Sequence, residues 1–454
     1  MEKVIIFGVG AYCKKRLSEF ANIGVVAFLD NRKLEENESL NGIPIYHPED
    51  IQKIEFDKIC IMTGYNHAQE IYKQLLGLGV SEDKIFRNDR DFFRAREQKD
   101  IRLSGKHPGE NDHVILVPNM FSSGGVRAAL YATMALKMLG KNVTVISPSN
   151  GEMEDEFNKN GADVIVSSDI SEANSQLWNF MKTRKVIIAN GLYFSYLISE
   201  LDKLENSKVV WWLHSGKSFY SIYYSKNDFR EIKHVKVFGV SSIVCNDFRT
   251  QTGIGKIGIL PFGIPYESNT NSEEGDKIVF ALIGAVMPVK GIDIFIEAIK
   301  NIPEELRSRA KFYIVGAYME KAYVSKVKNL AKGIKEIVFT GHLPHEKVIE
   351  LMSKIDVVVS ASREDMLPIT SIEAFMNEKM CIIPDNIGTV DYVEDGISAK
   401  IYQSGSTKEL SSEMVWCIKN PAQVERMKKA GKKVYDDWFS MEAFSNNLRK
   451  AMEE

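Results

Sequence analysis

The chain has 454 residues, a length that suggests about three domains. Hydrophobic residues make up 44% and charged residues 26% of the chain, which excludes disorder over most of its length. The 58 Lys and Arg residues nearly balance the 61 Asp and Glu residues, and the net charge of −3 gives no general attraction to nucleic acid. We therefore expect no nucleic-acid partner.

The five cysteines are far apart and form no C-x-x-C pair: Cys13, Cys60, Cys245, Cys381 and Cys417. This odd, scattered set predicts reduced and mostly buried thiols rather than a disulfide framework or a zinc site. No apolar run reaches the roughly 18 residues that a membrane span needs. The first residues have the pattern of a strand rather than of a signal peptide. We therefore expect a cytoplasmic protein.

Short β-branched runs alternate with segments of helical period, which predicts an α/β fold with parallel sheets. Buried strands are expected at 4–7, 25–29, 59–62, 114–117, 143–146, 186–188, 209–213, 278–282, 312–315, 337–340, 357–359 and 381–383. Polar stretches near 96–112 and 266–276 interrupt the pattern. They predict three α/β domains, residues 1–95, 113–270 and 271–454, with a linker at 96–112 and a last helix that crosses back.

In the first domain, a strand runs into Gly8-Val9-Gly10, and Asp30 closes the next strand. In a dinucleotide site the glycines approach a pyrophosphate and the later acid binds a ribose. The third fingerprint position is Cys13 rather than Gly, and a tight βα turn also explains the glycines. Residues 1–95 resemble a small Rossmann-like domain of bacterial surface-sugar enzymes. A nucleotide site and a purely structural turn both stay open here.

In the second domain, the loop Ser122-Ser123-Gly124-Gly125 follows a strand and opens a helix. Small residues at a helix N-terminus can admit a phosphate or a sugar close to the backbone. Farther on, His214 follows the apolar run Trp211-Trp212-Leu213. A side chain at the carboxyl end of a parallel strand lies where α/β proteins bind ligands.

In the third domain, Lys290 follows a strand and precedes a helix, a position that favours an anion. The most informative stretch is SREDMLPITSIEAF, residues 362–375. Pro368 suits the first turn of a helix, and Thr370 and Glu373 lie three residues apart on one side of it. Asp365 precedes that helix. Free backbone N–H groups suit a diphosphate, and carboxylates suit sugar hydroxyls.

Taken in order, these motifs resemble retaining glycosyltransferases of family 4, which have the GT-B fold of two facing Rossmann-like domains. The motifs are the SSGG loop, WWLHSG, LPFGIP at 260–265, the element that ends in Lys290-Gly291, and SREDMLPITSIEAF. FTGHLPHEKV at 339–348 and DDWFSMEAFSNNL at 436–448 also fit. The resemblance covers about residues 112–454.

The resemblance implies a nucleotide-diphosphate sugar as donor, no required cofactor and no metal. It implies that Glu373 holds the ribose, Lys290 neutralises the diphosphate, and Asp365 and His214 contact the sugar at the reaction centre. The remaining donor-binding positions that it implies are Gly124, Gly125, His342, Leu343, Glu364, Met366, Leu367, Pro368, Ile369 and Thr370.

Three positions depart from the family pattern. Asp365 stands where most members have Glu, so either the loop lies closer or Glu364 takes part. Ala285 stands where many members have Arg, which removes one phosphate cation. Phe262 replaces a common Asn. Asp365 and Ala285 keep a non-catalytic binding module open as an alternative. Another GT-B enzyme, such as an epimerase or a phosphorylase, is a third reading.

The acceptor is not readable from these motifs, and a glycan, a lipid-linked or a protein acceptor all fit. Because the first domain resembles domains of bacterial surface-sugar enzymes, analogy suggests a role in the assembly of bacterial surface polysaccharide or glycoconjugates. The basic stretch 426–433 could contact anionic lipid at the inner face of the membrane. A solvated helix face explains the same stretch.

Overall fold

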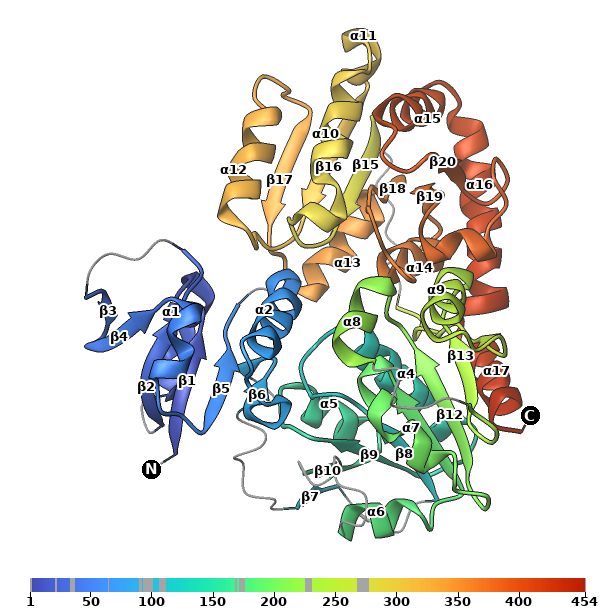
Figure 1. The fold of residues 1–454 in the computed structure, drawn as a ribbon. Helices are drawn as coiled ribbons and strands as arrows, with labels where there is room; N and C mark the ends of the chain where they lie inside the picture. The colour runs from blue at the N-terminus through green and yellow to red at the C-terminus, as the bar shows by residue number, and fades with distance from the viewer. Residues whose placement is uncertain are drawn as a thin grey trace. The chain divides into compact units, whose positions relative to one another are not determined.

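The computed structural model describes residues 2–20, 23–32, 37–63, 65–89, 92, 101–105, 112–167, 170, 176–224, 231–267 and 277–453. The chain forms two compact units, Met1–Ile101 and Arg102–Glu454. Among the described residues, three sheets carry the fold, one in the first unit and two in the second (Figure 1). The twelve strands expected from the sequence are all confirmed, and several short ones join them.

The sheet of the first unit has the order β3-β4-β2-β1-β5-β6, and its strands are parallel except β3. Its elements are β1 (Lys3–Phe7), α1 (Ala11–Arg16), β2 (Gly24–Leu29), β3 (Ser39–Leu40), β4 (Ile43–Tyr46), β5 (Lys58–Ile61), α2 (Tyr65–Gly77) and β6 (Ile85–Phe86). Side chains alternate along the central strand, so Ile5 and Phe7 enter one apolar cluster while Val4 and Ile6 enter the other. Both faces of this sheet are therefore covered.

The first sheet of the second unit has the order β14-β13-β12-β11-β8-β9-β10-β7. Its strands are β7 (Arg102–Ser104), β8 (His113–Leu116), β9 (Val143–Ser147), β10 (Asp163–Val166), β11 (Val186–Asn190), β12 (Lys208–Leu213), β13 (Lys236–Gly239) and β14 (Gly258–Ile259). Its helices are α4 (Gly124–Met138), α5 (Met153–Lys159), α6 (Gln176–Met181), α7 (Ser195–Leu201), α8 (Tyr220–Tyr223) and α9 (Ser242–Thr252).

Strand β7 corrects the expectation that residues 96–112 are a linker. Arg102–Ser104 pair antiparallel with β10, so these residues belong to the edge of the second sheet. The Oγ of Ser104 donates a 3.1 Å hydrogen bond to Glu154 on α5, and Arg102 pairs with the same carboxylate. The three residues of β7 are too few to show a hydrophobic pattern, so the sequence alone does not predict this strand. Its pairing with β10 identifies it. Residues 93–100 and 106–111 lie outside the described ranges.

The second sheet of this unit is parallel throughout, with the order β17-β16-β15-β18-β19-β20. Its strands are β15 (Ile278–Ile283), β16 (Ala310–Val315), β17 (Ile337–Gly341), β18 (Val357–Val359), β19 (Met380–Pro384) and β20 (Lys400–Tyr402). The helices are α10 (Ile292–Lys300), α11 (Glu304–Arg307), α12 (Lys321–Leu330), α13 (His345–Lys354), α14 (Ile369–Met376), α15 (Thr407–Lys419), α16 (Pro421–Val434) and α17 (Met441–Glu453). The architecture of the second unit is thus two facing Rossmann-like domains, the GT-B fold.

The last helix, α17, packs against α4 and β12 of the other domain. The chain reaches it through a π-helix at Tyr435–Phe439, which runs beside the outgoing segment 260–267. The backbone N–H of Ile264 donates to the carbonyl of Phe439 at 2.9 Å, and the Tyr435 hydroxyl donates to the carbonyl of Ile264 at 3.0 Å. Gly263 has no room for a side chain, since a Cβ there would stand 2.6 Å from that of Phe444. The chain crosses between the two domains at 260–267 and again at Tyr435–Phe439, and the backbones of these two segments pack directly against each other.

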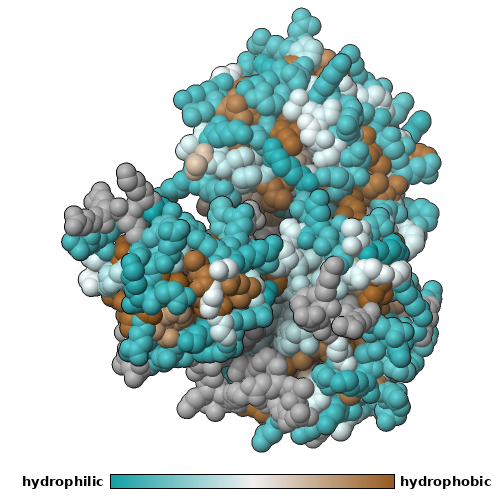
Figure 2. Space-filling view, in the orientation of Figure 1, coloured by the Kyte–Doolittle hydropathy of each residue, from teal (hydrophilic) through white to brown (hydrophobic). Residues whose placement is uncertain are grey.

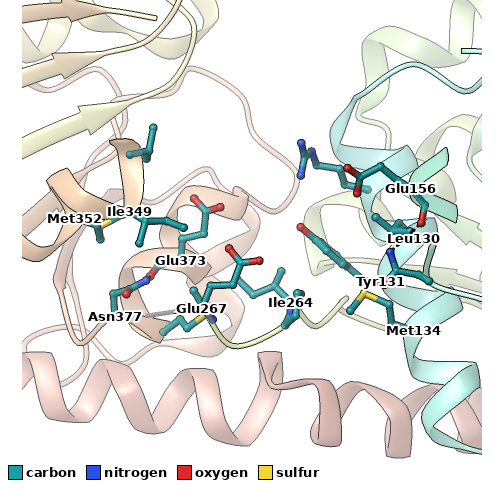
Figure 3. Close-up of a pocket in the computed structure, with 15 residues that line it drawn as sticks. Leu130, Tyr131, Met134, Glu156, Ile264, Glu267, Ile349, Met352, Glu373 and Asn377 are labelled. Carbon is teal, nitrogen blue, oxygen red and sulfur yellow. Dashed lines mark hydrogen bonds between the residues drawn. The ribbon is translucent and has the colours of Figure 1, made fainter. Parts of the chain in front are cut away.

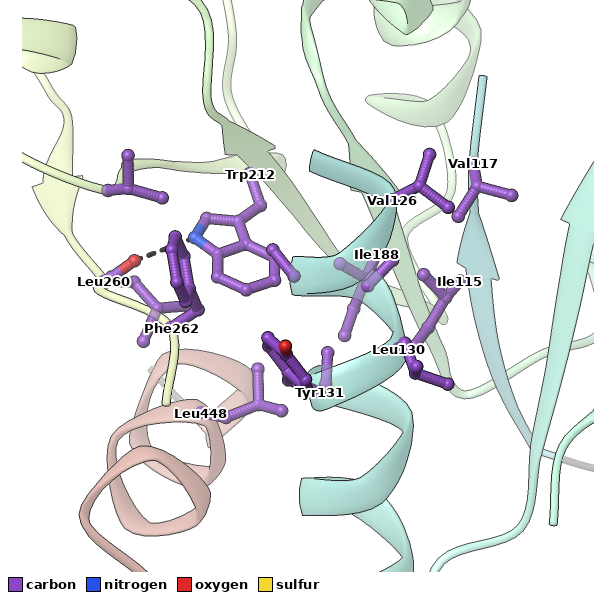
Figure 4. Packing of buried hydrophobic residues seen from close by; sticks show 14 of the residues in the cluster. Ile115, Val117, Val126, Leu130, Tyr131, Ile188, Trp212, Leu260, Phe262 and Leu448 are labelled. Atoms are coloured by element: carbon purple, nitrogen blue, oxygen red, sulfur yellow. Dashed lines mark hydrogen bonds between the residues drawn. The ribbon is translucent and has the colours of Figure 1, made fainter. Parts of the chain in front are cut away.

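Aromatic side chains fill the junction between α4, β12 and α17 (Figure 4). Trp212 is fully buried, donates its indole N–H to the carbonyl of Leu260 at 2.8 Å, and stacks on Phe444 at 5.6 Å between ring centroids. Phe262 is 3% exposed and lies between the rings of Tyr131 and His214, 6.4 Å from each. Its position in this core explains why an apolar ring stands at residue 262.

No helix of the described ranges is long and apolar enough to cross a membrane. In the view of Figure 2, polar side chains cover most of the surface and hydrophobic residues form small patches between them.

Candidate active site

Strands β11 and β12 end side by side, and each delivers one polar side chain. Asn190 is the last residue of β11, and His214 follows the last residue of β12. The Nε2 atom of His214 lies 2.8 Å from the amide oxygen of Asn190, and the amide NH2 of Asn190 donates to the carbonyl of Gly125 at 3.0 Å. Because the Asn190 oxygen can only accept, Nε2 carries the hydrogen and Nδ1 of His214 is the acceptor.

His214 is a neutral imidazole in this setting. Burial lowers its pKa to about 3, since the charged form would lose its hydration beside Trp212 and Phe262. The imidazole can therefore accept one hydrogen bond through Nδ1 at neutral pH, and it holds no positive charge for a phosphate.

The glycine loop before α4 opens the helix next to this pair. The hydroxyl of Ser123 caps the helix by accepting from the N–H of Val126 at 3.4 Å. A Cβ at Gly124 would meet nothing within 4 Å, and one at Gly125 would come within 4.0 Å of the Cβ of His214. The surroundings of Gly124 leave space for a ligand, and Gly125 gives the helix its close approach to His214.

On the other domain, Lys290 ends the short turn Pro288–Lys290 before α10. Gly291 next to it has φ +64°, and a Cβ there would stand 1.9 Å from the carbonyl oxygen of Ala361. Only glycine fits this left-handed, crowded position. The lysine turn is therefore pressed against the chain that leads out of β18.

An arginine clamps that chain segment in place. The guanidinium of Arg363 binds both carboxylate oxygens of Asp293, at 3.1 and 3.0 Å, and also donates to the carbonyl of Pro288. Burial would raise the pKa of Asp293, but hydrogen bonds from Arg363, Tyr323 and Lys326 outweigh it and hold the pKa well below its usual range. The bidentate pair fixes the loop that carries the next two carboxylates.

The two carboxylates of that loop point to different partners. Asp365 accepts a 2.6 Å hydrogen bond from the ammonium of Lys290 and is 16% exposed. The neighbouring Glu364 lies against Gly216 of the other domain, where a Cβ would stand 2.3 Å from its Oε1 atom. The sequence left open whether a closer loop or Glu364 compensates for the short Asp365. In the structure, Asp365 takes the lysine and Glu364 reaches across to the other domain.

The backbone after these carboxylates leads into α14. The carbonyl of Asp365 accepts from the N–H of Gly388 at 3.1 Å, and Met366 is half-buried beside Gly216. Leu367 and Pro368 are buried, so they offer main-chain atoms rather than side chains. Ile369 and Thr370 form the first, half-buried turn of α14, whose free N–H groups favour an anion.

Glu373 points into a pocket between the domains (Figure 3). One wall comes from α13 and α14, and the other from α4, α5 and the segment 264–267. The lining residues include Arg127, Tyr131, Glu156, Glu267, Ile349, Met352 and Glu373. His214, Lys290 and Asp365 are not among its lining residues, so Glu373 projects from α14 to a different region than the carboxylates before that helix.

Two further predicted residues lie in the loop between β17 and α13. His342 is exposed and Leu343 is half-buried. Gly341 before them has φ +70° and approaches the ring of Tyr318. Neither His342 nor Leu343 lines the Glu373 pocket.

In the first unit, the glycine turn is closed by its own residues. Asp30 accepts hydrogen bonds from the N–H groups of Val9 and Arg32, each at 3.0 Å. Gly8 has φ +104° and a Cβ there would stand 2.6 Å from the methyl of Thr63. Gly10 precedes α1 and has open space around it. These contacts give Gly8 and Asp30 a structural role in the turn between β1 and α1. A nucleotide site at this turn stays a prediction.

Within the described ranges, no three His, Cys, Asp or Glu side chains are grouped so that they could hold a metal ion. The five cysteines are free and buried.

Several residues of the site were not predicted from the sequence. Asn190, Arg363, Asp293 and Gly388 act through partners far away in the sequence. Gly388 is packed against the carbonyl of Met366 and the side chain of Ser241. A fixed pairing of Asp293 and Arg363 across 70 residues is visible only in the fold.

Comparison with known proteins gives two family matches and distant relatives. Residues 265–434 match the family described as "Glycosyl transferases group 1", and residues 1–86 match "C2185-like, N-terminal". An uncharacterised glycosyltransferase of Methanocaldococcus jannaschii is 25% identical over 183 residues, which are 40% of this chain and 49% of that protein. The alpha-D-kanosaminyltransferase of Streptomyces kanamyceticus is 24% identical over 34% of this chain and 39% of that protein. The chain thus spans half or less of these relatives.

Solved structures show the same fold over about three quarters of this chain. Anabaena Alr3699/HepE, determined with UDP and glucose, has a TM-score of 0.61 at 15% identity and covers 76% of this chain and 100% of its own. A glycosyltransferase from Rickettsia africae has a TM-score of 0.61 at 18% identity, with 76% and 98% covered. The fold is therefore that of GT-B glycosyltransferases.

Proposed function

We propose that the chain is a glycosyltransferase that moves a sugar from a nucleotide-diphosphate sugar to an acceptor hydroxyl. We further propose that it retains the anomeric configuration and belongs to family 4. The observation that carries this proposal is the contact of Glu364 and Met366 with Gly216 of the other domain. The two side chains flank Asp365, which binds Lys290 at 2.6 Å, and Gly216 lies two residues after His214. Cation, helix N-terminus and carboxylate are the groups that a diphosphate and a sugar need.

In this reaction the bond between the anomeric carbon and the β-phosphate oxygen breaks, and negative charge develops on the leaving diphosphate. Lys290 and the first turn of α14 stabilise that charge. Before the donor binds, Lys290 is neutralised by Asp365, so the diphosphate competes with Asp365 for the ammonium. Glu373 binds the ribose from the pocket that it lines. The acceptor oxygen forms the new bond, and its proton passes to the departing phosphate.

The comparisons support the donor class. The Anabaena protein binds UDP and glucose in its structure, and the kanosaminyltransferase is named for the transfer of a sugar. The residues matched by the glycosyl transferases group 1 family include Lys290, Asp365 and Glu373. We propose a role in bacterial surface polysaccharide or glycoconjugate assembly, in the cytoplasm at the inner face of the membrane, with the first unit as an additional Rossmann-like domain.

The test is a panel of UDP, GDP, CDP, ADP and dTDP sugars, scored for thermal stabilisation and for slow release of nucleoside diphosphate. We expect one donor class to stabilise the wild type and to be hydrolysed. Glu373→Ala removes the carboxylate from the pocket and should weaken both signals at least tenfold. Glu378→Gln changes an exposed carboxylate five residues away and serves as the control.

Full donor hydrolysis in Glu373→Ala would overturn the assigned site. No response of the wild type to any donor would favour the non-catalytic module. The replacement of Arg by Ala285 and of Glu by Asp365 motivates that second candidate.

A further inference from the structure

The N-terminus of α9 is capped by a side chain from the other domain of the second unit. Helix α9 follows β13 in the domain that carries His214, which we call the His214 domain. Asp391 lies in the domain that carries Asp365, the Asp365 domain, and its carboxylate accepts from both the backbone N–H and the hydroxyl of Ser242. Because Ser242 is the first residue of α9, Asp391 satisfies one of the N–H groups that a helix leaves free at this end.

The helix's own N-cap residue makes no capping bond. Ser241 occupies that position with the extended backbone that a cap needs, at φ −156° and ψ 168°. Its hydroxyl is buried and has no hydrogen-bond partner within the described ranges. A Cβ on Gly388 of the Asp365 domain would stand 2.7 Å from the Cβ and Oγ of Ser241. The residue suited to cap α9 is therefore covered by the other domain, and Asp391 of that domain caps the helix instead.

These contacts form one seam between the domains. The hydroxyl of Tyr392 donates to the carbonyl of Val240 at 2.8 Å, and Tyr392 is 9% exposed. Its ring meets Phe439 edge to face, with 4.9 Å between centroids. Residues 240–242 of one domain and the short turn Gly388–Tyr392 of the other thus pack together, and we call them the domain seam.

The domain seam continues into the carboxylate loop of the candidate site. The N–H of Gly388 donates to the carbonyl of Asp365 at 3.1 Å, and Asp365 and Ile387 form a parallel bridge. The side chain of Asp365 binds Lys290 at 2.6 Å. The contacts that hold Gly388 on the His214 domain therefore also hold Asp365 and Lys290 there.

We propose that Asp391 is a positioning residue of the glycosyl transfer, and that it exchanges the cap of α9 with Ser241. With the domains docked, Asp391 caps the helix and the carboxylate loop is held on the His214 domain. With the domains apart, the Ser241 hydroxyl turns to the free N–H groups of α9 and caps the helix in its place. This inference rests on the proposed glycosyl transfer and names the residue pair that balances its closed and open forms.

The exchange makes docking reversible. Serine and aspartate are about equally good N-caps, so neither the closed nor the open form leaves α9 without a cap. An enzyme that closes on its donor must open again to release product. Loss of Asp391 alone should favour the open form, loss of Ser241 alone should favour the closed form, and loss of both should restore the balance. A bond with only a structural role would not be rescued by a second loss.

Distances between the domains test the exchange without any substrate. Lys203→Cys and Lys408→Cys place one exposed label site in each domain, and the five native cysteines are buried. We expect Asp391→Ala to move the distance distribution in pulsed EPR away from that of the wild type, and the double variant with Ser241→Ala to bring it back. Asp391→Asn keeps an acceptor oxygen and should resemble the wild type.

Donor hydrolysis tests the positioning role. Asp391→Ala should lower kcat about fivefold to tenfold, the effect of one lost helix cap, while KM for the donor changes less than about twofold. The donor KM is spared because the groups proposed to bind the diphosphate lie within one domain. The double variant with Ser241→Ala should recover most of kcat. Asp395→Ala is the matched control, since this exposed carboxylate accepts from the N–H of Ile401 at 2.8 Å inside its own domain.

An unchanged distance distribution in Asp391→Ala would overturn the proposal, as would an equal loss of kcat in Asp395→Ala. A Ser241→Ala variant that moves the distances in the same direction as Asp391→Ala would overturn the cap exchange. If the wild type hydrolyses no donor, the transferase proposal has failed, and the distances alone then decide whether the two caps exchange.

Discussion

Gly216 and Glu364 touch across the two domains of the second unit: a Cβ at residue 216 would stand 2.3 Å from the Oε1 atom of Glu364. Gly216 lies two residues after His214, and Glu364 directly precedes Asp365, the carboxylate that binds Lys290. This contact brings together the two motifs that the proposed reaction needs, WWLHSG and SREDMLPITSIEAF, which are far apart in the sequence.

The contact predicts that Gly216→Ala impairs turnover more than folding. The new methyl group meets the ends of two flexible side chains, Glu364 and Met366, which can move aside. We expect a loss of stability below about 1 kcal/mol and a drop of donor hydrolysis of at least tenfold. Gly388→Ala is the contrast, since its Cβ would stand 1.8 Å from the carbonyl oxygen of Met366 and should cost about 1–3 kcal/mol or more. Urea unfolding beside hydrolysis assays checks both, and unchanged turnover in Gly216→Ala would contradict the role of the contact.

Lys290→Gln should weaken donor binding by about tenfold or more with little change in stability. The substitution removes the cation proposed to meet the diphosphate, whereas Asp365 stays partly hydrated at 16% exposure. Lys326→Gln is the control, because Lys326 is 58% exposed and its partner Asp293 keeps Arg363 and Tyr323. Titration calorimetry with the donor found in the panel measures the affinities. Similar losses in both variants would show that Lys290 has no special part in donor binding.

His214 makes stability depend on pH in the acid range. Its folded pKa of about 3 lies below the ordinary value near 6.5, so the unfolded chain binds the proton first as the pH falls. Stability is therefore unaffected above about pH 6.5 and decreases from there toward pH 3. His214→Gln should flatten this slope in urea unfolding at pH 7.5 and 5, and His67→Gln, at a 74% exposed side chain, should not. An identical slope in wild type and His214→Gln would show that the imidazole is not buried neutral.

A protein of residues 102–454 should fold and keep donor-dependent stabilisation. The second unit has its own sheets and cores, and the glycine turn of the first unit is closed by Asp30 and Thr63. The cut must precede Arg102, because β7 pairs with β10. Thermal melting with the nucleotide-sugar panel measures the effect. Stabilisation that disappears on truncation but persists in Glu373→Ala would place the nucleotide site in the first unit.

The sequence alone determined the α/β rhythm and most of the strands. Buried parallel strands such as Val143–Ser147 are nearly continuous apolar runs, and their pattern is visible without a partner. Edge strands such as Arg102–Ser104 and Gly258–Ile259 were missed, since two or three residues paired on one side need no such pattern. The motif order also sufficed to name the candidate carboxylates and the lysine.

Only the tertiary structure decided how these groups face one another. It assigned Lys290 to Asp365 and Glu364 to Gly216, set the tautomer of His214 through Asn190, and placed Arg363 on Asp293. Each of these is a contact between chain segments at least 24 residues apart. The local hydrophobic pattern of the sequence indicates which residues are buried or helical. Contacts between distant segments depend instead on where the strands end in space. That is why the chemistry of single residues could be read from the chain, and their pairing could not.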